Sequence, residues 1–278
     1  MQIAEPRTIE HGSEWTAEPK VVIVMPAYNA AATLEATYHA IDARCLDEII
    51  LVDDCSQDET VTVAEKLSLR VIRHAKNLGY GGNQKTCYRE ALRRGADIIV
   101  MLHPDGQYDP ALLPDLIRPV AEGRADIVLG SRFIIPGGAR RGGMPLYRFV
   151  ANRFLTFWEN LILRRRLSEY HTGYRAYSRA FLETVPFLQN SDGFCFDTEI
   201  LVQAVAFRQR LVEVPIATRY FPGASSASLA QCVIYGVMTL ATLLKFLLHR
   251  WQLYSSKIFN STPDRAIRKY GKSPAIAA

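Results

Sequence analysis

The amino-acid sequence predicts an α/β fold with a mainly parallel β-sheet and helices on both faces. Short apolar runs typical of buried strands alternate with stretches of helix-forming residues that are long enough to cross from one strand to the next. Each apolar run ends in polar or glycine-rich residues. Because ligands of such sheets bind outside the carboxyl ends of the strands, we expect a ligand site at that edge.

The expected elements follow one another in the order strand, helix, strand. The strands are expected at residues 20–25, 48–52, 70–73, 100–102 and 126–129. The helices between the first four strands are expected at residues 30–43, 59–67 and 84–94. Runs rich in Val, Ile and Leu are typical of parallel strands that are buried on both faces, and this composition supports the assignment.

The most informative segment is the acidic turn after the apolar run 100–102. It contains Asp105, Gln107 and Asp109, whose side-chain oxygens are hard ligands of the kind that Mg²⁺ or Mn²⁺ accepts beside waters and substrate phosphates. An ordinary turn that caps the next helix would use the same residue types. The turn indicates a divalent cation that holds a diphosphate, with Asp105 as the first metal ligand and Gln107 as the second.

Two further polar loops follow expected strands. Asp53 and Asp54 come directly after the second strand, and the glycine-rich residues 77–83, which include Gly79, follow the third. The glycines permit a tight turn or the close approach of a ligand to the backbone, but they lack the spacing of a dinucleotide-binding fingerprint. The two aspartates either cap the next helix or face a ligand, since Ser56 and other nearby residues are also able to cap it.

Taken together, these segments resemble the family 2 glycosyltransferases with the GT-A fold. The resemblance is to the branch that contains dolichol-phosphate mannosyltransferase and other polyprenyl-phosphate glycosyltransferases. Seven landmarks recur in order, at residues 26–29, 52–60, 77–83, 105–110, 130–133, 172–177 and 212–216. The similarity spans residues 20–222, and the ordered recurrence makes it far more specific than any single motif.

The resemblance implies an inverting transfer of a sugar from a nucleoside-diphosphate sugar, with Mg²⁺ or Mn²⁺ as cofactor and a polyprenyl phosphate as the preferred acceptor. It implies that Pro26, Tyr28, Gly79 and one carboxylate of Asp53 and Asp54 surround the nucleotide. The aspartate would accept the imino N–H of the base, and the tyrosine ring would stack on it.

Four arginines form an expected anion-binding set for the phosphates of donor and acceptor. They are Arg132, Arg148, Arg175 and Arg219. The planar guanidinium pairs bidentately with phosphate oxygens, which suits this role. Arg132 and Arg175 stand within the landmarks, and Arg132 is also expected to act in catalysis together with Asp105. Each arginine, taken singly, also fits an ordinary surface position.

The choice of acceptor decides whether a general base is needed. A polyprenyl phosphate is already ionised, whereas a sugar hydroxyl requires a carboxylate within hydrogen-bonding reach. Asp197 and Glu199 are the candidate bases for transfer to a sugar hydroxyl during polysaccharide assembly. Their alternative role is structural, because acidic residues in the first turn of a helix interact favourably with the helix dipole.

The sequence departs from the family pattern at two positions. The metal motif usually reads Asp-x-Asp, and its first position here is His103; the Tyr-Asn pair is usually followed by Glu, and here by Ala30. His103 either ligates the cation, which would favour a transition metal, or leaves coordination to Asp105 and Gln107. These departures also motivate a third hypothesis, a catalytically silent protein that binds nucleotide sugars.

Two segments bear on membranes and on nucleic acid. Residues 140–166 interleave arginines with aromatic residues, but no nucleic-acid-binding motif accompanies them, so we expect no nucleic-acid partner. Residues 229–251 carry a polar stripe beside an apolar stripe, which favours an amphipathic helix over a membrane span. Both segments fit either a membrane interface or helices that bury their apolar side in the protein.

The chain of 278 residues and net charge +5 fits one catalytic domain with an extension. We expect an N-terminal arm over residues 1–19, the GT-A domain over 20–222, an amphipathic helical extension over 223–254 and a mobile tail over 255–278. Five cysteines without a C-x-x-C pair give no disulfide or zinc framework. The N-terminus does not read as a secretory signal, so we expect a peripheral protein at the cytoplasmic face of the membrane.

Overall fold

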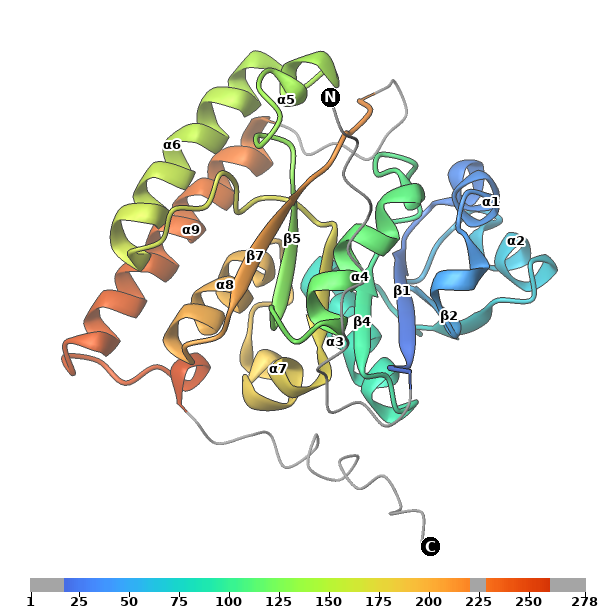
Figure 1. The fold of residues 1–278 in the computed structure, drawn as a ribbon, viewed down its shortest axis with the longest axis horizontal. Coiled ribbons are helices and arrows are strands. Elements are labelled where there is room, and N and C mark those ends of the chain that lie inside the picture. The colour runs from blue at the N-terminus through green and yellow to red at the C-terminus, as the bar shows by residue number, and fades with distance from the viewer. Residues whose placement is uncertain (1–17, 221–228, 261–278) are drawn as a thin grey trace, which may run out of the picture.

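A seven-stranded β-sheet forms the centre of the protein, as the computed structural model shows for residues 18–220 and 229–260 (Figure 1). The strand order is β3-β2-β1-β4-β6-β5-β7. The strands are β1 (Val21–Ala27), β2 (Glu48–Asp53), β3 (Arg70–Arg73), β4 (Ile98–Met101), β5 (Ile127–Ser131), β6 (Arg175–Ser178) and β7 (Leu211–Pro215). This arrangement confirms the predicted α/β class and all five expected strands.

One strand breaks the parallel pattern. β1, β2, β3 and β4 are parallel to one another, and β5 is parallel to β7, but β6 is antiparallel to both β4 and β5. Its register sets Arg175 opposite Met101 of β4 and Leu129 of β5. β6 therefore brings residues from a late landmark into the middle of the sheet, beside the strand that leads to the acidic turn.

Helices cover both faces of the sheet. They are α1 (Ala31–His39), α2 (Thr60–Lys66), α3 (Gly79–Arg93), α4 (Leu113–Ala121), α5 (Gly138–Arg141), α6 (Leu146–Leu163), α7 (Arg179–Thr184), α8 (Phe196–Ala206) and α9 (Leu229–Arg250). Short 3₁₀ turns lie at η1 (Ala43–Cys45), η2 (Pro110–Leu112), η3 (Phe187–Gln189) and η4 (Lys257–Phe259).

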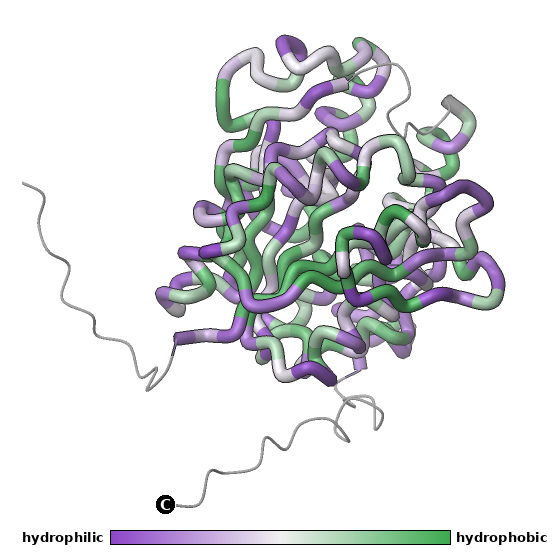
Figure 2. Tube along the Cα trace, turned by 90° about the vertical axis from the view of Figure 1, so that its right-hand side faces the viewer, coloured by the Kyte–Doolittle hydropathy of each residue, from purple (hydrophilic) through white to green (hydrophobic). Residues whose placement is uncertain are grey.

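The sheet separates two hydrophobic cores because successive side chains of a strand point to opposite faces. Val22 and Val24 of β1 join a cluster with residues of α3, α7 and α8, whereas Val21, Ile23 and Met25 join a second cluster with residues of α1, α2 and α4. The apolar strands are the continuous hydrophobic centre of Figure 2. This double burial explains why the strands read as uninterrupted apolar runs.

Helix α3 begins at Gly79, five residues before the expected start at residue 84. The N–H groups of Gly81 and Gly82 donate to the backbone carbonyl of Asp192, at 2.7 and 3.2 Å. A Cβ atom on Gly81 would lie 2.3 Å from the backbone oxygen of Ser191. The glycines are thus required for the close approach of the chain at Ser191 and Asp192 to the first turn of α3.

The chain after α9 folds back onto the catalytic domain. Ile258 and Phe259 of η4 are buried in the same core cluster as α8, and the backbone oxygen of Ile258 accepts a hydrogen bond from Nε2 of Gln203 at 2.9 Å. The mobile tail expected from residue 255 therefore starts with packed residues, because two apolar side chains cover α8. The N-terminal arm up to residue 17 and the tail beyond residue 260 lie outside the described residues.

The packing of α3 leads to a stability prediction. Gly81→Ala should lower the free energy of unfolding by about 1–3 kcal/mol, because the added methyl group meets backbone atoms that cannot move independently. Gly236→Ala is the matched control: its Cβ would lie 3.9 Å from Leu155, and replacing a mid-helix glycine should raise stability by up to about 1 kcal/mol. Urea unfolding measures both, and equal effects would contradict the close packing at Gly81.

Candidate active site

The acidic turn after β4 and the segment after β7 meet at the carboxyl edge of the sheet. The backbone N–H of Arg219 donates to the carbonyl of Gln107 at 3.1 Å, and Tyr108 forms an isolated antiparallel bridge with Thr218. The side chain of Arg219 is exposed, next to a cavity of about 440 Å³ that Arg141 and Tyr220 also line. Arg219 is thus the expected phosphate-binding arginine that lies beside the acidic turn.

The acidic turn is closed by its own side chains. Oδ1 of Asp105 accepts the N–H of Gln107 at 3.0 Å, and Oδ2 accepts Nε2 of the same residue at 3.0 Å. Oδ1 of Asp109 accepts the N–H of Ala111 at 3.0 Å and so caps η2. Asp109 therefore takes the capping role, whereas the side chains of Asp105 and Gln107 hydrogen-bond to each other at the turn.

The donor set fits a cation that relies on its substrate for ligands. Among residues 18–220 and 229–260, no group of three His, Cys, Asp or Glu side chains is placed to hold a metal ion. Mg²⁺ and Mn²⁺ commonly keep waters and substrate phosphates and use one or two carboxylates. Asp105 with Gln107 meets this pattern.

His103 lies between two tyrosine rings. Its ring is stacked on that of Tyr80 with centroids 5.7 Å apart, and the Tyr108 ring lies 6.5 Å away on centroids. Nε2 of His103 is 3.5 Å from the Tyr80 hydroxyl. Burial lowers the pKa of this imidazole, so the ring is neutral at pH 7.

The two aspartates at the end of β2, Asp53 in its last position and Asp54 directly after it, have different partners. The carboxylate of Asp54 accepts the N–H groups of Leu78 (2.8 Å) and Gly79 (3.0 Å), and it lies 2.7 Å from Nδ1 of His74. Oδ2 of Asp53 accepts the N–H of Ser56, but its buried Oδ1 has no hydrogen-bond partner among the described residues. An unpaired buried oxygen is costly, so Asp53 is the aspartate of the pair that remains available for a ligand.

Pro26 and Tyr28 lie at the end of β1, next to this carboxylate. Pro26 is buried and pairs with Val52 of β2, so it shapes the strand end rather than presenting a polar group. Tyr28, one residue beyond the strand, is 54% exposed. Gly79 has a structural role: its N–H donates to Asp54, and its φ is +83°, a value that residues with a side chain rarely adopt.

Arg175 and Asp197 form an interior ion pair. Nη1 of Arg175 lies 3.2 Å from Oδ1 of Asp197, and the remaining donors reach the carbonyls of Thr172 and Tyr170. Oδ2 of Asp197 accepts the Tyr80 hydroxyl at 2.7 Å. The Arg175 side chain is fully buried, so it stabilises the site from within and is not placed to bind a phosphate.

Arg132 is engaged in a second buried pair. Its backbone N–H and its guanidinium donate to Glu169, and Nη2 also reaches the carbonyl of His171 at 3.0 Å. Arg148, by contrast, is partly exposed in the first turn of α6, where its Nε donates to the Tyr147 hydroxyl at 3.1 Å. Of the four expected arginines, Arg132 pairs with the buried Glu169 and Arg175 with the partly buried Asp197, whereas Arg148 and Arg219 lie nearer the surface.

Glu199 does not share the surroundings of Asp197. The two residues are two positions apart on α8, about 200° around the helix, so their side chains leave it in opposite directions. Glu199 is buried and its Oε2 accepts the N–H of Ser191 at 2.5 Å. It fixes the chain that packs on α3, and both candidate bases are thus engaged by neighbouring groups.

Sequence reasoning did not single out Tyr80, Tyr108 or Glu169. Tyr80 and Tyr108 enclose His103, the Tyr108 hydroxyl accepts the N–H of Gly173 at 3.0 Å, and Glu169 pairs with Arg132. The two tyrosines stand inside recognised landmarks, which was an available signal. Glu169 lies outside every landmark and gave none.

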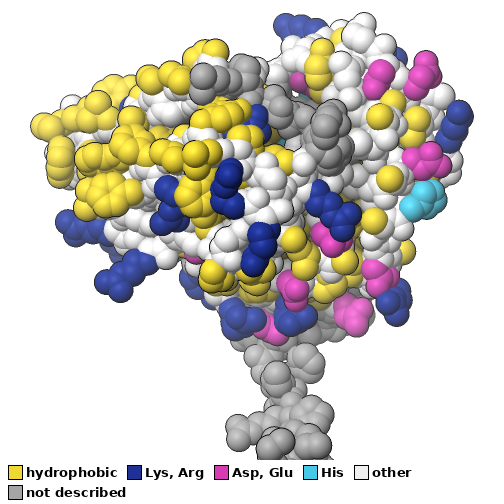
Figure 3. Space-filling model, turned by 90° about the horizontal axis from the view of Figure 1, so that it is seen from above, with side chains coloured by type: hydrophobic (Ala, Val, Ile, Leu, Met, Phe, Trp, Pro, Cys, Tyr) yellow, Lys and Arg dark blue, Asp and Glu magenta, His cyan; other side chains and the backbone are white. Residues whose placement is uncertain are grey.

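Helices α6 and α9 lie side by side (Figure 1). Both bury several polar side chains and expose many apolar ones. They bury polar side chains against the protein, namely Asn152, Thr156, Glu159, Thr239 and Thr242. Most of their exposed side chains are apolar, among them Val150, Phe154, Phe157, Trp158, Leu161, Val233, Val237, Leu240 and Leu244. Figure 3 shows a broad hydrophobic area on this side of the molecule, with Lys and Arg at its border.

Helix α9 is long and apolar enough to cross a membrane by length and composition, but other observations oppose a span. The segment of the helix with sufficient length and hydropathy is Ala230–Arg250. Thr239 and Thr242 on its buried side pack against the protein, and η4 returns the chain to α8. The geometry fits a helix that lies along a surface.

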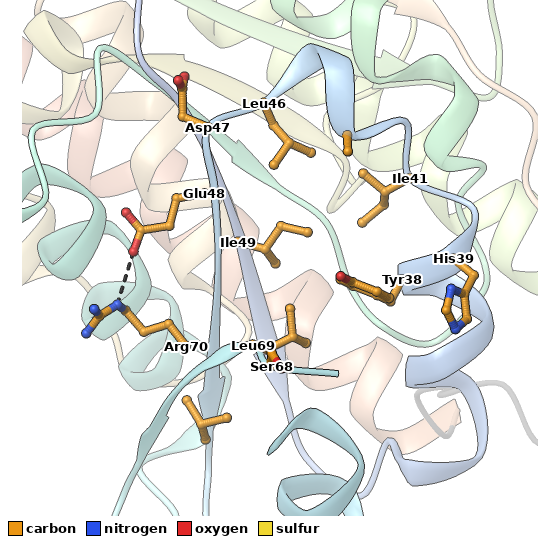
Figure 4. A pocket seen from close by; sticks show the side chains of 12 residues that line it. Tyr38, His39, Ile41, Leu46, Asp47, Glu48, Ile49, Ser68, Leu69 and Arg70 are labelled. Carbon is orange, nitrogen blue, oxygen red and sulfur yellow. Dashed lines mark hydrogen bonds and ion pairs between the residues drawn. The ribbon is translucent and has the colours of Figure 1, made fainter. Parts of the chain in front are cut away.

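A cavity of about 710 Å³ lies away from these residues, between α1 and the amino ends of β2 and β3 (Figure 4). Its lining includes Tyr38, Ile49 and the ion pair between Glu48 and Arg70. None of the predicted site residues lines it. The predicted site residues therefore all lie outside this cavity.

The burial of Glu199 leads to a pH-dependent prediction. Burial raises the pKa of Glu199, so the folded protein holds this proton more tightly than the unfolded chain. The contribution to stability is fully present below the ordinary pKa of about 4.3 and is lost as pH rises through the raised folded-state pKa. Relative to wild type, Glu199→Gln should therefore gain free energy of unfolding as pH rises from about 4 to 7. Urea unfolding tests this, and a difference constant with pH would contradict it.

This chain is similar to known proteins over most of its length. The model of Glycosyl transferase family 2 matches residues 22–185. Polyprenol monophosphomannose synthase of Mycolicibacterium smegmatis is 30% identical over 205 residues, which cover 71% of this chain and 76% of that protein. Undecaprenyl-phosphate mannosyltransferase of Micrococcus luteus is 30% identical over 204 residues, covering 71% and 82%.

Solved structures show the same fold. Glucosyl-3-phosphoglycerate synthase of Mycobacterium tuberculosis, in complex with Mn²⁺, uridine diphosphate and phosphoglyceric acid, superposes with a TM-score of 0.64. The similarity covers 86% of this chain and 80% of that one at 20% sequence identity, so it speaks for the fold alone. Together with the family model, which spans more than half of the sequence, these findings establish that the chain belongs to glycosyl transferase family 2 and has the GT-A fold.

Proposed function

We propose that this enzyme is an inverting, cation-dependent glycosyltransferase that moves a sugar from a nucleoside-diphosphate sugar to a polyprenyl phosphate. The observation that carries the choice of acceptor is the engagement of both candidate bases: Asp197 pairs with Arg175 and Glu199 accepts the N–H of Ser191. An acceptor phosphate brings its own negative oxygen and needs no base. The relatives named above act on polyprenyl substrates, as their names state, which supports the same class here.

Asp53 and Tyr28 form the proposed nucleotide end of the site. The unpaired Oδ1 of Asp53 is suited to accept an N–H from the base, which would repay its burial. The exposed ring of Tyr28 offers a face on which the base stacks. Pro26 supports this end from within β1.

Asp105 and Gln107 form the proposed diphosphate end, with Arg219 beside them. When bound there, a divalent cation stabilises the negative charge that develops on the leaving diphosphate. Asp105 supplies the charged oxygen, Gln107 an amide oxygen, and the exposed Arg219 side chain is placed to pair with a phosphate. The sheet brings these groups together although they lie over a hundred residues apart.

Transfer then requires one displacement at the anomeric carbon. An oxygen of the acceptor phosphate forms the new bond to that carbon while the bond to the diphosphate oxygen breaks, and a single displacement inverts the configuration. Arg132 and Arg175 act as positioning residues, because they fix the chain around Tyr170, His171 and Thr172 next to the turn. Arg148 and Arg219 are the arginines that remain for the acceptor and donor phosphates.

The exposed apolar side chains of helices α6 and α9 support a location at the membrane surface. An apolar face with arginines at its border suits the headgroup region of an anionic leaflet, where a polyprenyl phosphate resides. Nucleotide sugars are supplied from the cytoplasm, so we place the enzyme at the cytoplasmic face as a peripheral protein.

The metal site leads to a prediction for activity. Asp105→Asn should reduce cation-dependent transfer to polyprenyl phosphate by about a hundredfold or more while the fold persists, because the carboxylate holds the cation. The measurement is the rate at which labelled sugar moves from donor into extracted lipid, as a function of Mn²⁺ concentration. Asp109→Asn, in the same turn but capping η2, is the matched control and should remain active.

An Asp105→Asn enzyme with unchanged rate and metal dependence would contradict the site. Wild-type enzyme that binds the donor but never turns it over with any acceptor would instead support a silent nucleotide-sugar-binding protein. Transfer to free sugar hydroxyls alone would redirect attention to Asp197, freed from Arg175.

The membrane proposal also has a direct test. The protein should sediment with anionic liposomes at low salt and be released at high salt, since exposed charges are screened over about 8 Å at physiological ionic strength. Trp158→Ser and Leu240→Ser should weaken binding, because both side chains lie on the exposed apolar face. Leu78→Ser is the matched control, with the same 37% exposure as Trp158 but no place on α6 or α9. Equal sedimentation with and without liposomes would exclude this surface.

A further inference from the structure

We propose that the cavity between α5 and the chain after β7 binds the head of the acceptor, with the phosphate at Arg141 and Thr218 and the first prenyl unit at Ile135. These residues belong neither to the acidic turn nor to the nucleotide end of the site. The inference rests on the proposed function and names the place that its acceptor occupies.

Two segments of main chain hold the shape of this cavity. α5 and Gly142 form one wall, and residues 216–220 form the other. The N–H of Tyr220 donates to the carbonyl of Gly142 at 2.9 Å, and a Cβ built on Gly142 would lie 2.3 Å from the backbone oxygen of Thr218. The volume of about 440 Å³ lies within the ordinary range of ligand pockets, about 300–1,000 Å³. The cavity is therefore already formed and large enough for a phosphate with an apolar group attached.

The side chains around the cavity favour an anion. Arg141 and Arg219 are exposed and belong to opposite walls, and no Asp or Glu stands among the described residues that line the cavity. Nη2 of Arg141 donates to the carbonyl of Pro136 at 2.8 Å, a neutral group that does not compensate the charge. Because a guanidinium pairs well with phosphate oxygens, a phosphate is the ligand that these two residues suit best.

A buried hydroxyl without a partner lies at the same place. Thr218 lines the cavity and is 5% exposed, and its Oγ1 forms no hydrogen bond with any described residue. A buried polar group of this kind is costly as long as it stays unpaired. A phosphate oxygen in the cavity would accept a hydrogen bond from this hydroxyl.

The cavity adjoins the acidic turn on one side and the apolar helices on the other. The N–H of Arg219 donates to the carbonyl of Gln107 at 3.1 Å. Ile135, which lines the cavity, is 41% exposed, and α5 lies against α6, which begins with the 63% exposed Leu146 (Figure 1). A phosphate in the cavity would thus lie beside the donor diphosphate, with apolar side chains leading from it toward the proposed lipid surface.

Equilibrium binding tests the site without turnover. Farnesyl phosphate, a short polyprenyl phosphate, is titrated into the full-length protein by isothermal titration calorimetry, and inorganic phosphate and farnesol are titrated beside it. We expect farnesyl phosphate to bind at least about tenfold more tightly than either of the other probes, because only it contacts both the charged and the apolar part of the cavity.

Two arginines of α5 separate the cavity from the general charge of the protein. Arg141→Gln should weaken the binding of farnesyl phosphate about tenfold. Arg140→Gln removes the same charge from the same helix and should leave that binding unchanged, because Arg140 does not line the cavity. The affinity for UDP in the presence of Mn²⁺ should be unchanged in both variants. Equal losses of farnesyl phosphate affinity would attribute binding to net charge and overturn the site.

Thr218→Val removes the unpaired hydroxyl and keeps the branched shape of the side chain. The affinity for farnesyl phosphate should fall about threefold to tenfold, whereas the free energy of unfolding should not fall, since the hydroxyl has no partner to lose. A variant with lower stability and unchanged affinity would contradict the proposal, because the hydroxyl would then serve the fold.

The outcomes distinguish this inference from the proposed function. If the wild-type protein binds UDP with Mn²⁺ but does not bind farnesyl phosphate, the proposed acceptor class itself fails. If the wild type binds farnesyl phosphate and both Arg141→Gln and Thr218→Val bind it equally well, the acceptor class stands and this site is wrong. Binding of inorganic phosphate as tight as that of farnesyl phosphate would make the cavity a general phosphate site and overturn its assignment to the acceptor.

Discussion

A buried ion pair between Arg175 and Asp197 holds together the elements on which the candidate site is built. Arg175 enters the sheet on the antiparallel strand β6, and Asp197 opens helix α8. Tyr80 of α3 donates to the same carboxylate and stacks on His103, which precedes the acidic turn. Removing one partner of such a pair leaves an uncompensated buried charge, at a cost of about 3–5 kcal/mol. This contact joins β6, α8 and α3, and through the Tyr80 ring it reaches the residue that precedes the acidic turn.

A second set of polar contacts links helices α6 and α9 to the chain around His171. Nδ1 of His171 lies 2.9 Å from the Tyr235 hydroxyl of α9, and its Nε2 lies 3.1 Å from Glu159 of α6. The carbonyl of His171 accepts from Arg132. Several polar residues of both helices face inward, and a group of large apolar residues faces outward. The surface proposed to contact lipid and the chain beside the acidic turn are therefore parts of one packed unit.

The sequence allowed the sheet to be predicted because buried parallel strands leave a strong apolar signal between polar loops. β6 was not predicted as a strand, because its four residues begin with an arginine and lack an apolar run; they were recognised only as part of a family landmark. The partners of Arg132 and Arg175 were not predictable, since Glu169 and Asp197 come from distant segments that only the fold brings near. Asp53 and Asp54 looked equivalent until hydrogen bonds separated them. The sequences of α6 and α9 indicated amphipathic helices. Which side of each helix faces outward depends on tertiary contacts and was not predictable.

We propose that a cation at the site balances the charge of the leaving diphosphate and that the acceptor brings its own ionised oxygen. The most direct test compares two acceptors with the same prenyl chain in the same liposomes, one a polyprenyl phosphate and the other the free alcohol. We expect transfer to the phosphate, and transfer to the alcohol slower by about a hundredfold or more, because a general base typically contributes that much. Equal or faster transfer to the alcohol would contradict it, because a base would then have to act where Asp197 is now paired.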